Sequence, residues 1–307
     1  MPIAYLTHPS CLLHEMGSYH PECPDRLTAI SDRLIASGVD GSVTHITARP
    51  ATDDEIARVH GRAYIAELRA ASPAEGLHYL DPDTALNAHT LDAARHAAGA
   101  VVQAVDLVLG GSFRTAFCAV RPPGHHAERK RAMGFCVYNN IAIGARHALE
   151  AHGLKRVAIV DFDVHHGNGT EEIFADDPRV LMVSTFQYPL YPYSGVNPLG
   201  PNMVNIPLAA GTGGAALRDA VQTRWIPALD AHRPELILIS AGFDAHREDP
   251  LAGLSWSDAD YAWVTREIAT VAERHAQGRI VSSLEGGYAL SALGRSATLH
   301  IRELATA

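Results

Sequence analysis

Three marks of secreted, membrane and nucleic-acid-binding proteins are missing from this 307-residue sequence. The four cysteines, Cys11, Cys23, Cys118 and Cys136, have no CxxC spacing and are too few for a disulfide framework in so long a chain. We expect reduced thiols, with Cys118 in the core because it lies in an apolar run. No apolar run approaches the roughly 18 residues of a membrane span, so no membrane association is expected.

Neither a secretory signal nor a basic block is visible. Residues 1–8 lack the basic region and the apolar stretch of about 7–15 residues that a signal peptide needs, which predicts a soluble, cytoplasmic protein. Lys and Arg number 25 against 34 Asp and Glu, and the formal net charge of −9 is spread without blocks of one sign. A nucleic-acid partner is therefore not expected.

Short apolar runs alternate with amphipathic helical patterns along most of the chain. Hydrophobic residues make up 47% of the sequence, which is enough for a sizeable core. Near-continuous Val, Ile, Leu and Ala runs are typical of strands covered by helices on both faces, so the pattern predicts an α/β fold with a mainly parallel central sheet flanked by helices. The expected strands are 3–6, 115–120, 157–160, 180–183, 204–206, 236–239 and 280–284.

The chain is predicted to form one domain over residues 1–307, because no linker, repeat or low-complexity tract interrupts it. The expected helices with recognisable ends are 24–37, 91–109, 139–152 and one that starts at Ser257 and closes before Gly278. Residues 70–90 and 185–202 look irregular, and long irregular segments in a compact domain are often functional loops.

Polar and titratable residues follow four of the expected strands, in segments 121–126 (RPPGHH), 161–169 (DFDVHHGNG), 240–246 (SAGFDAH) and 285–288 (EGGY). Ligands of an open parallel sheet bind outside the carboxyl ends of its strands, so these segments should converge. Asp163 and His165 are two apart and can face one point, with Asp161 one step deeper and Asp244 as a third ligand. Two carboxylates and one imidazole leave a position open for water, as in catalytic metal sites.

A plainer interpretation is that the two aspartates cap helices and that the histidines are surface residues. The recurrence of such residues after several strands favours the metal site.

His125 and His126 follow a rigid Pro-Pro-Gly turn, and paired imidazoles beside a metal suggest proton transfer, although exposed loop histidines are the alternative. Tyr288 follows two glycines that permit close approach, and its hydroxyl is a candidate oxyanion donor, although the same pattern occurs in ordinary turns.

Residues 211–216 (GTGGAA) offer a competing hypothesis. They match the GxGxx[G/A] pattern of a dinucleotide-binding oxidoreductase and lie between an apolar run and a helical pattern. No acidic residue ends a strand about 20 residues further on, and a glycine turn into the helix that contains Leu217 and Trp225 explains the segment equally well.

The strand-end residues resemble the histone deacetylase family, within the arginase-deacetylase fold group. The matching segments run in the family's order over nearly the whole chain: 20–27 (HPECPDRL), 121–127 (RPPGHHA), 134–140 (GFCVYNN), 161–170 (DFDVHHGNGT), 240–244 (SAGFD) and 285–288 (EGGY). The form is most similar to class II-like bacterial members. The resemblance implies a sheet of about eight strands and a single zinc-dependent deacetylase domain.

The resemblance also implies roles for individual residues. Asp163, His165 and Asp244 would hold a catalytic Zn²⁺. His126 would be the general base and later the acid, and Tyr288 would polarise the acyl carbonyl. The remaining implied roles are His125 hydrogen-bonded to Asp161, a tunnel formed by Gly134, Phe135, Tyr191 and Leu251, and a structural K⁺ site at Asp161, Asp163, His165 and Ser184.

Two positions depart from the family pattern. Asn168 stands where class I members have an Asp beside the second histidine, and Tyr191 stands where the family usually has Phe. A neutral partner stabilises a charged His126 less, which leaves open which histidine carries the resting proton.

The implied activity is removal of acetyl or related acyl groups from the ε-amino group of lysine in a protein or peptide. The alternative is an acetylpolyamine amidohydrolase acting on a small acylated amine. A protein that binds acyl groups without hydrolysing them would be expected to lack Tyr288, one of the paired histidines or a metal ligand. The sequence has all of these residues. Polyamine-specific relatives have a Glu where this chain has Leu251, which favours lysine, although Asp81, Asp83 or Glu22 would supply a rim carboxylate. A homo-oligomer is left open.

Overall fold

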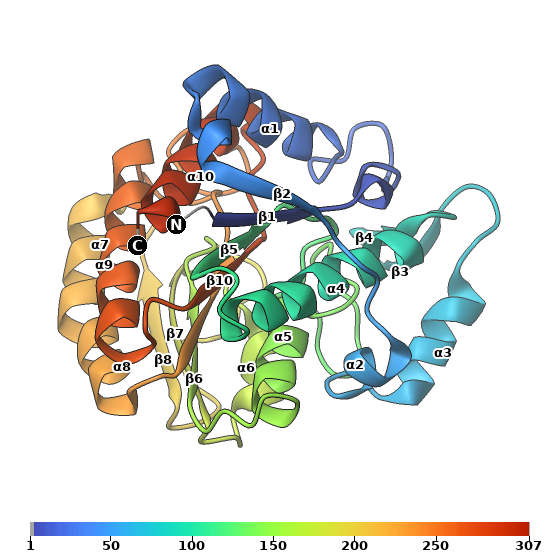
Figure 1. The fold of residues 1–307 in the computed structure, drawn as a ribbon. Helices are drawn as coiled ribbons and strands as arrows, with labels where there is room; N and C mark the ends of the chain where they lie inside the picture. The colour runs from blue at the N-terminus through green and yellow to red at the C-terminus, as the bar shows by residue number, and fades with distance from the viewer. Residues whose placement is uncertain (1–2, 307) are drawn as a thin grey trace.

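The computed structural model describes residues 3–306, and its centre is an eight-stranded parallel sheet (Figure 1). The strand order is β2-β1-β5-β10-β9-β6-β7-β8. This architecture confirms the predicted α/β fold with a parallel sheet. The strands are β1 (Ile3–Thr7), β2 (Val43–Thr47), β5 (Thr115–Cys118), β6 (Val157–Asp161), β7 (Val180–Gln187), β8 (Met203–Leu208), β9 (Leu236–Ala241) and β10 (Ile280–Leu284).

Helices cover both faces of the sheet (Figure 1). One layer contains α4 (Thr90–Leu109), α5 (Asn140–Glu150) and α6 (Asn168–Phe174). The opposite layer contains α1 (Asp25–Ser37), α7 (Gly214–Ala220), α8 (Ile226–His232), α9 (Asp258–His275) and α10 (Leu290–Ala305), in which α10 packs against both α1 and α9. The short helices α2 (Asp53–Ala57) and α3 (Arg62–Ala71) lie beside the first layer. No helix within residues 3–306 is long and apolar enough to cross a membrane.

The central strands are apolar because helices cover them on both sides. Every residue of β6, β9 and β10 is buried, as the continuous Val, Ile, Leu and Ala runs predicted. Strand β2 was not predicted, since it lies at the sheet edge and its sequence VTHIT has no continuous apolar run. Cys118 is in the core, and all four cysteines are free.

The register of the sheet brings the predicted chemistry to one edge. Asp161 at the end of β6 pairs with Ser184 of β7 on one side and with Ser240 of β9 on the other. Ala241 of β9 pairs with Leu284 of β10. The segments that follow β6, β9 and β10 therefore leave the sheet at the same level.

The two segments expected to be irregular are only partly so. Residues 70–90 contain an antiparallel hairpin of β3 (His78–Asp81) and β4 (Thr84–Leu86). Strand β7 continues to Gln187, and residues 188–202 then form a loop. Both segments lie near the polar edge of the sheet, because Asp83 and Tyr191 line the same cavity there.

Candidate active site

The three predicted metal ligands converge at the ends of β6 and β9. The Nδ1 atom of His165 lies 3.1 Å from Asp163 Oδ1 and 3.2 Å from Asp244 Oδ2. Ligand atoms of all three side chains lie within 4.8 Å of one another. Both carboxylates are buried, and Asp244 Oδ2 accepts no hydrogen bond from residues 3–306, so a buried oxygen remains available for a cation.

The electrostatics of this group call for positive charge between the carboxylates. Burial and the charge of the neighbouring Asp163 together raise the pKa of Asp244 to about 6. Burial alone would lower the pKa of His165, but the contact with Asp163 and the negative charges of Asp163 and Asp244 outweigh burial and raise the pKa to about 10. A divalent cation would neutralise the same oxygens, and two carboxylates with one imidazole are a donor set that zinc accepts.

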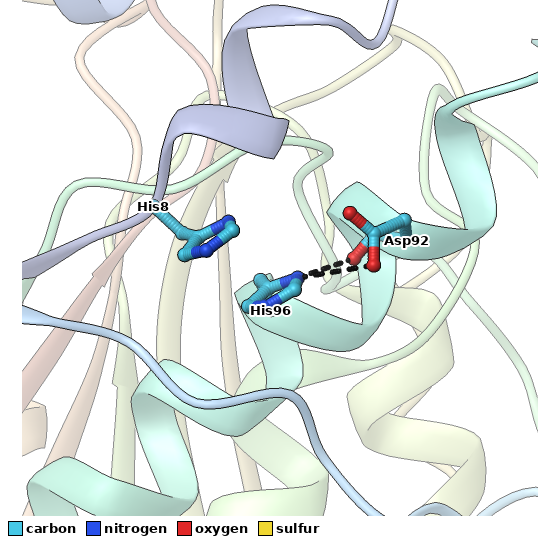
Figure 2. A group of neighbouring side chains, drawn as sticks. All are labelled: His8, Asp92 and His96. Carbon is cyan, nitrogen blue, oxygen red and sulfur yellow. Dashed lines mark hydrogen bonds and ion pairs between the residues drawn. The ribbon is translucent and has the colours of Figure 1, made fainter.

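A second His/Asp group, His8, Asp92 and His96, fits a metal less well (Figure 2). The two imidazole rings are stacked with their centroids 3.5 Å apart and their planes 3° from parallel. Nδ1 of His8 accepts a hydrogen bond from the Ser10 amide, and Nδ1 of His96 lies 2.9 Å from the Asp92 carbonyl oxygen. Parallel rings direct their lone pairs side by side, so these nitrogens do not converge on one ion.

The third group, Asp106, His147 and His152, lies next to cationic side chains. Nε2 atoms of both histidines contact Asp106 Oδ1, at 2.6 and 2.8 Å. The Arg58 guanidinium lies 2.6 Å from the other nitrogen of His147, and Arg49 lies 3.7 Å from the second oxygen of Asp106. These arginines supply the positive charge that a metal ion would bring.

The two adjacent histidines have different partners. His125 Nδ1 lies 3.0 Å from Asp161 Oδ2, and His126 Nδ1 lies 2.8 Å from Asn168 Oδ1. The Asn168 amide nitrogen donates to Glu128 at 2.9 Å, which orients its oxygen toward His126. Nδ1 of His126 is therefore the donor, and Nε2 keeps the lone pair.

The same contacts give the two histidines different pKa values. Burial lowers the pKa of both rings, because it disfavours the charged form of each. For His125 the carboxylates of Asp163 and Asp161 outweigh burial and raise the pKa to about 10. For His126 burial and the charges of His125 and His165 hold the pKa well below its usual value. The arrangement therefore favours a charged His125 beside a neutral His126, the pairing that the sequence left open.

Tyr288 reaches the site because its preceding glycines pass close to the metal-ligand group. A Cβ atom on Gly286 would lie 2.0 Å from Asp244 Oδ2, so no side chain fits there. Gly287 has a φ of 121°, a conformation that glycine adopts readily. The Tyr288 ring lies T-shaped to Phe135 at 5.9 Å, and the Arg26 guanidinium lies 5.0 Å from its centroid.

A cavity of about 220 Å³ reaches His165 of the metal-ligand group. Its lining includes the four predicted tunnel residues, Gly134, Phe135, Tyr191 and Leu251. Gly134 has a φ of 55°, and a Cβ there would lie 2.5 Å from the His126 ring. Leu190, Asp83 and the site residues His126, His165 and Tyr288 complete the lining.

Of the three carboxylates considered for the rim, only Asp83 lines this cavity. The expectation for Glu22 is wrong, since its side chain is fully buried between Arg26 and Arg121 and forms ion pairs with both. Arg26 in turn donates to the carbonyl oxygen of Gly287 at 2.8 Å. The segment 20–27 therefore supports the Tyr288 loop from within.

Sequence reasoning missed two further buried acids. Glu285 Oε2 accepts from the main-chain amides of Gly124 and His125, at 2.7 and 3.1 Å, and thereby holds the turn that carries the histidine pair. Asp249 makes the corresponding contacts to the amides of Tyr288 and Ala289. Glu285 stands within a quoted motif and also accepts from the Ser240 hydroxyl, but the contacts by which both acids hold these loops are to backbone amides, which leave no mark in a sequence.

The structure leaves the predicted potassium site untested and disfavours the predicted dinucleotide site. Asp161 and Ser184 lie opposite each other on neighbouring strands, and the potassium site stays a prediction. Residues 211–216 lead into the seven-residue α7, and a Cβ on Gly214 would lie 2.0 Å from the carboxylate of Asp260. The Asp260 carboxylate and the Arg218 guanidinium that pairs with it fill the space beside Gly214 that a phosphate would need, which disfavours the dinucleotide site.

The chain belongs to the histone deacetylase family, because the histone deacetylase domain matches residues 20–304. It is 39% identical to histone deacetylase 14, chloroplastic, of Arabidopsis thaliana over 93% of this chain and 73% of that protein. It is 38% identical to the histone deacetylase-like amidohydrolase of Pseudomonas aeruginosa over 88% of this chain and 72% of that protein.

Two further comparisons bear on substrate and fold. The chain is 37% identical to polyamine deacetylase HDAC10 of Homo sapiens, over 92% of this chain but only 45% of that protein. The crystal structure of the HDA15 HD domain superposes with a TM-score of 0.93 at 36% identity and covers 100% of this chain and 90% of that one. The family is thus one of deacetylases and amidohydrolases, and its members differ in the amine that carries the acyl group.

Proposed function

We propose that this protein is a zinc-dependent amidohydrolase that removes acetyl or related acyl groups from the ε-amino group of lysine. The observation that carries the proposal is the cavity of about 220 Å³ that is lined by His126, His165 and Tyr288. A candidate base, one of the metal-ligand residues and a candidate oxyanion donor thus line one cavity together with the predicted tunnel residues.

Asp163, His165 and Asp244 would hold the Zn²⁺ ion, and the unpartnered oxygen of Asp244 fits this role. When bound there, zinc would polarise the acyl carbonyl and lower the pKa of a water molecule. Asp163 Oδ1 accepts the main-chain amide of His165, and Asp244 Oδ1 accepts that of Val164, so both carboxylates are oriented before any ion binds.

His126 is the proposed general base because its Nε2 lone pair is free and its ring is neutral. It takes the proton of the attacking water and then delivers it to the leaving amine. His125 remains charged beside Asp161 and stabilises the negative charge that develops at the reacting centre. Tyr288 donates its hydroxyl proton in a hydrogen bond to the acyl oxygen.

Lysine is the proposed amine because Leu251, and no acid, occupies the decisive position in the tunnel lining. An apolar residue suits the neutral acyl-lysine stem and offers no partner to a distant ammonium group. Acetylpolyamine hydrolysis is the second candidate, favoured by Asp83 in the same lining and by the names of the HDAC10 relatives. Burial and the neighbouring Asp81 raise the pKa of Asp83, which weakens it as an ammonium site.

The test is turnover by zinc-reconstituted protein on a panel of acyl-lysine peptides, acetylputrescine and acetylspermidine. We expect peptides to give the higher kcat/KM. Better turnover of the acetylpolyamines would contradict the lysine assignment and establish the second candidate. The proposal also includes a structural potassium ion, a single-domain organisation and a cytoplasmic location. Removal of potassium tests the first of these, and the cooperativity of unfolding tests the second.

A further inference from the structure

We propose that Asp249 is a positioning residue for the Tyr288 hydroxyl. This inference rests on the proposed function, in which that hydroxyl donates to the acyl oxygen. Asp249 lies in the loop after β9 and is 7% exposed. Among residues 3–306 its carboxylate makes no hydrogen bond to another side chain. It acts instead on the main chain.

One carboxylate oxygen of Asp249 accepts two consecutive main-chain amides. The N–H of Tyr288 lies 2.7 Å from Oδ2, and the N–H of Ala289 lies 3.2 Å from the same oxygen. Ala289 is the N-cap residue of α10, and the first N–H groups of a helix have no partner within it. The carboxylate therefore fixes the start of α10 and the backbone of Tyr288.

The other oxygen, Oδ1, accepts the main-chain amide of Leu251 at 3.0 Å. Leu251 and Tyr288 both line the tunnel, although they come from loops after different strands. One buried carboxylate thus joins these two loops and sets the separation between a tunnel wall and the oxyanion donor.

The Tyr288 hydroxyl depends on this backbone because no hydrogen bond joins it to another protein group within residues 3–306. Its ring is T-shaped to Phe135 and lies against the Arg26 guanidinium, and neither contact is a hydrogen bond that would fix the hydroxyl. Gly287 before it has a positive φ and adds little stiffness. Main-chain bonds to Asp249 and Arg26 are therefore what locate the hydroxyl.

Asp249→Asn tests the proposal with little change in size. The variant replaces one acceptor oxygen by an NH₂ group, which donates and cannot accept, so one of the two loops loses its bond whichever way the amide turns. We expect kcat to fall about 10–100-fold with KM changed less than about threefold, since a displacement of about 1 Å can cost 10²-fold in rate.

A double variant separates positioning from a general structural role. In Tyr288→Phe there is no hydroxyl to position, so adding Asp249→Asn should lower kcat less than about twofold further, because residues that act as a unit are not additive. An equal loss of kcat in both backgrounds would overturn the proposal.

Asp260→Asn is the matched control. Asp260 is 6% exposed and accepts the Ser257 amide at 2.8 Å at the start of α9, away from the tunnel. We expect both Asp249→Asn and Asp260→Asn to lower the unfolding temperature, because each weakens a buried contact at the start of a helix. Asp260→Asn should nevertheless leave kcat within about twofold of the wild type. A comparable loss of kcat in Asp260→Asn would mean that general destabilisation explains both.

Amide hydrogen exchange gives a readout that needs no substrate. The peptide that spans 285–292 should exchange faster in Asp249→Asn than in the wild type or in Asp260→Asn. Unchanged exchange would overturn the role of Asp249. Inactivity of the wild type on both acyl-lysine peptides and acetylpolyamines would instead overturn the proposed function, so the two failures are distinguishable.

Discussion

The floor of the tunnel and its rim are built in different ways. The floor consists of Asp163, Asp244, His125 and His126, none of which is more than 4% exposed, together with His165. The rim includes the loop 188–202, where Tyr193 is 71% exposed and Leu199 is 63% exposed. Floor side chains are buried and fixed by strand ends and main-chain donors, whereas several rim side chains are exposed to solvent.

This difference separates the reaction from the choice of substrate. Main-chain amides orient both floor carboxylates, so the geometry of the chemistry belongs to the parallel sheet itself. Loops tolerate changes in sequence and length because little of their backbone is buried. Floor substitutions should therefore abolish the reaction, and rim substitutions should only redistribute rates among substrates.

The largest effect is expected for Asp244→Ala. Its removal leaves two of the three proposed ligands, too few to hold zinc in a geometry open to substrate. The purified variant should contain no tightly bound zinc and show no measurable turnover. The control is Asp92→Ala, which removes the acid of the His8 group and should retain zinc in full. Full zinc occupancy in Asp244→Ala would refute the ligand assignment.

Tyr288→Phe should have the next largest effect. It removes only the hydroxyl, so the protein should fold and retain zinc while kcat falls about 10²–10³-fold, the usual loss for one oxyanion donor. Metal content and the unfolding temperature test whether the variant retains zinc and folds, and steady-state kinetics measures the loss in kcat. Turnover near the wild-type rate would remove Tyr288 from the mechanism.

Acid should weaken the interior that supports the floor. His300 is fully buried against Phe162 and Phe243, and burial lowers its pKa from 6.5 to about 3. The unfolded chain then binds more protons than the folded one between these values, so stability is complete above pH 6.5 and declines as the pH falls toward 3. One such group costs about 2 kcal/mol between pH 7 and pH 5.

Urea unfolding at pH 7 and pH 5 measures this decline. Burial also lowers the pKa of His60, to about 4, so its contribution has the same sign. His300→Gln should show a shallower decline than the wild type, whatever its stability at pH 7. An unaltered decline in that variant would contradict the assignment of the acid sensitivity to His300.

The floor was accessible from the sequence, whereas much of the rim and its supports was not. Alternation along an extended segment places Asp163 and His165 on one side, and parallel strands bring Asp244 to the same edge, so residue spacing alone predicted the cluster. Glu285 and Asp249 bind backbone N–H groups, which every residue except proline has, and no spacing reveals such partners. Glu22 was wrongly considered for the rim because its burial depends on arginines from distant segments.

The smallest effect is expected at the rim, for Leu251→Glu. A carboxylate there gives the distal ammonium of an acetylpolyamine a partner, and partly exposed pairs are worth at most about 1 kcal/mol, or roughly fivefold in kcat/KM. The ratio of peptide to acetylspermidine turnover should therefore narrow by about that factor, with kcat for peptides little changed because the floor is intact.

Leu251→Gln is the control for this change, since it has the size of Glu without the charge. Its substrate ratio should stay near that of the wild type, and the gain in Leu251→Glu should shrink as salt screens the pair. Asp83→Asn tests the opposing carboxylate, and it should reduce acetylspermidine turnover if Asp83 binds the ammonium. If the ratio of peptide to acetylspermidine turnover were the same in Leu251→Glu and Leu251→Gln, charge at the rim would not select the amine. The tunnel would then discriminate between substrates by shape alone.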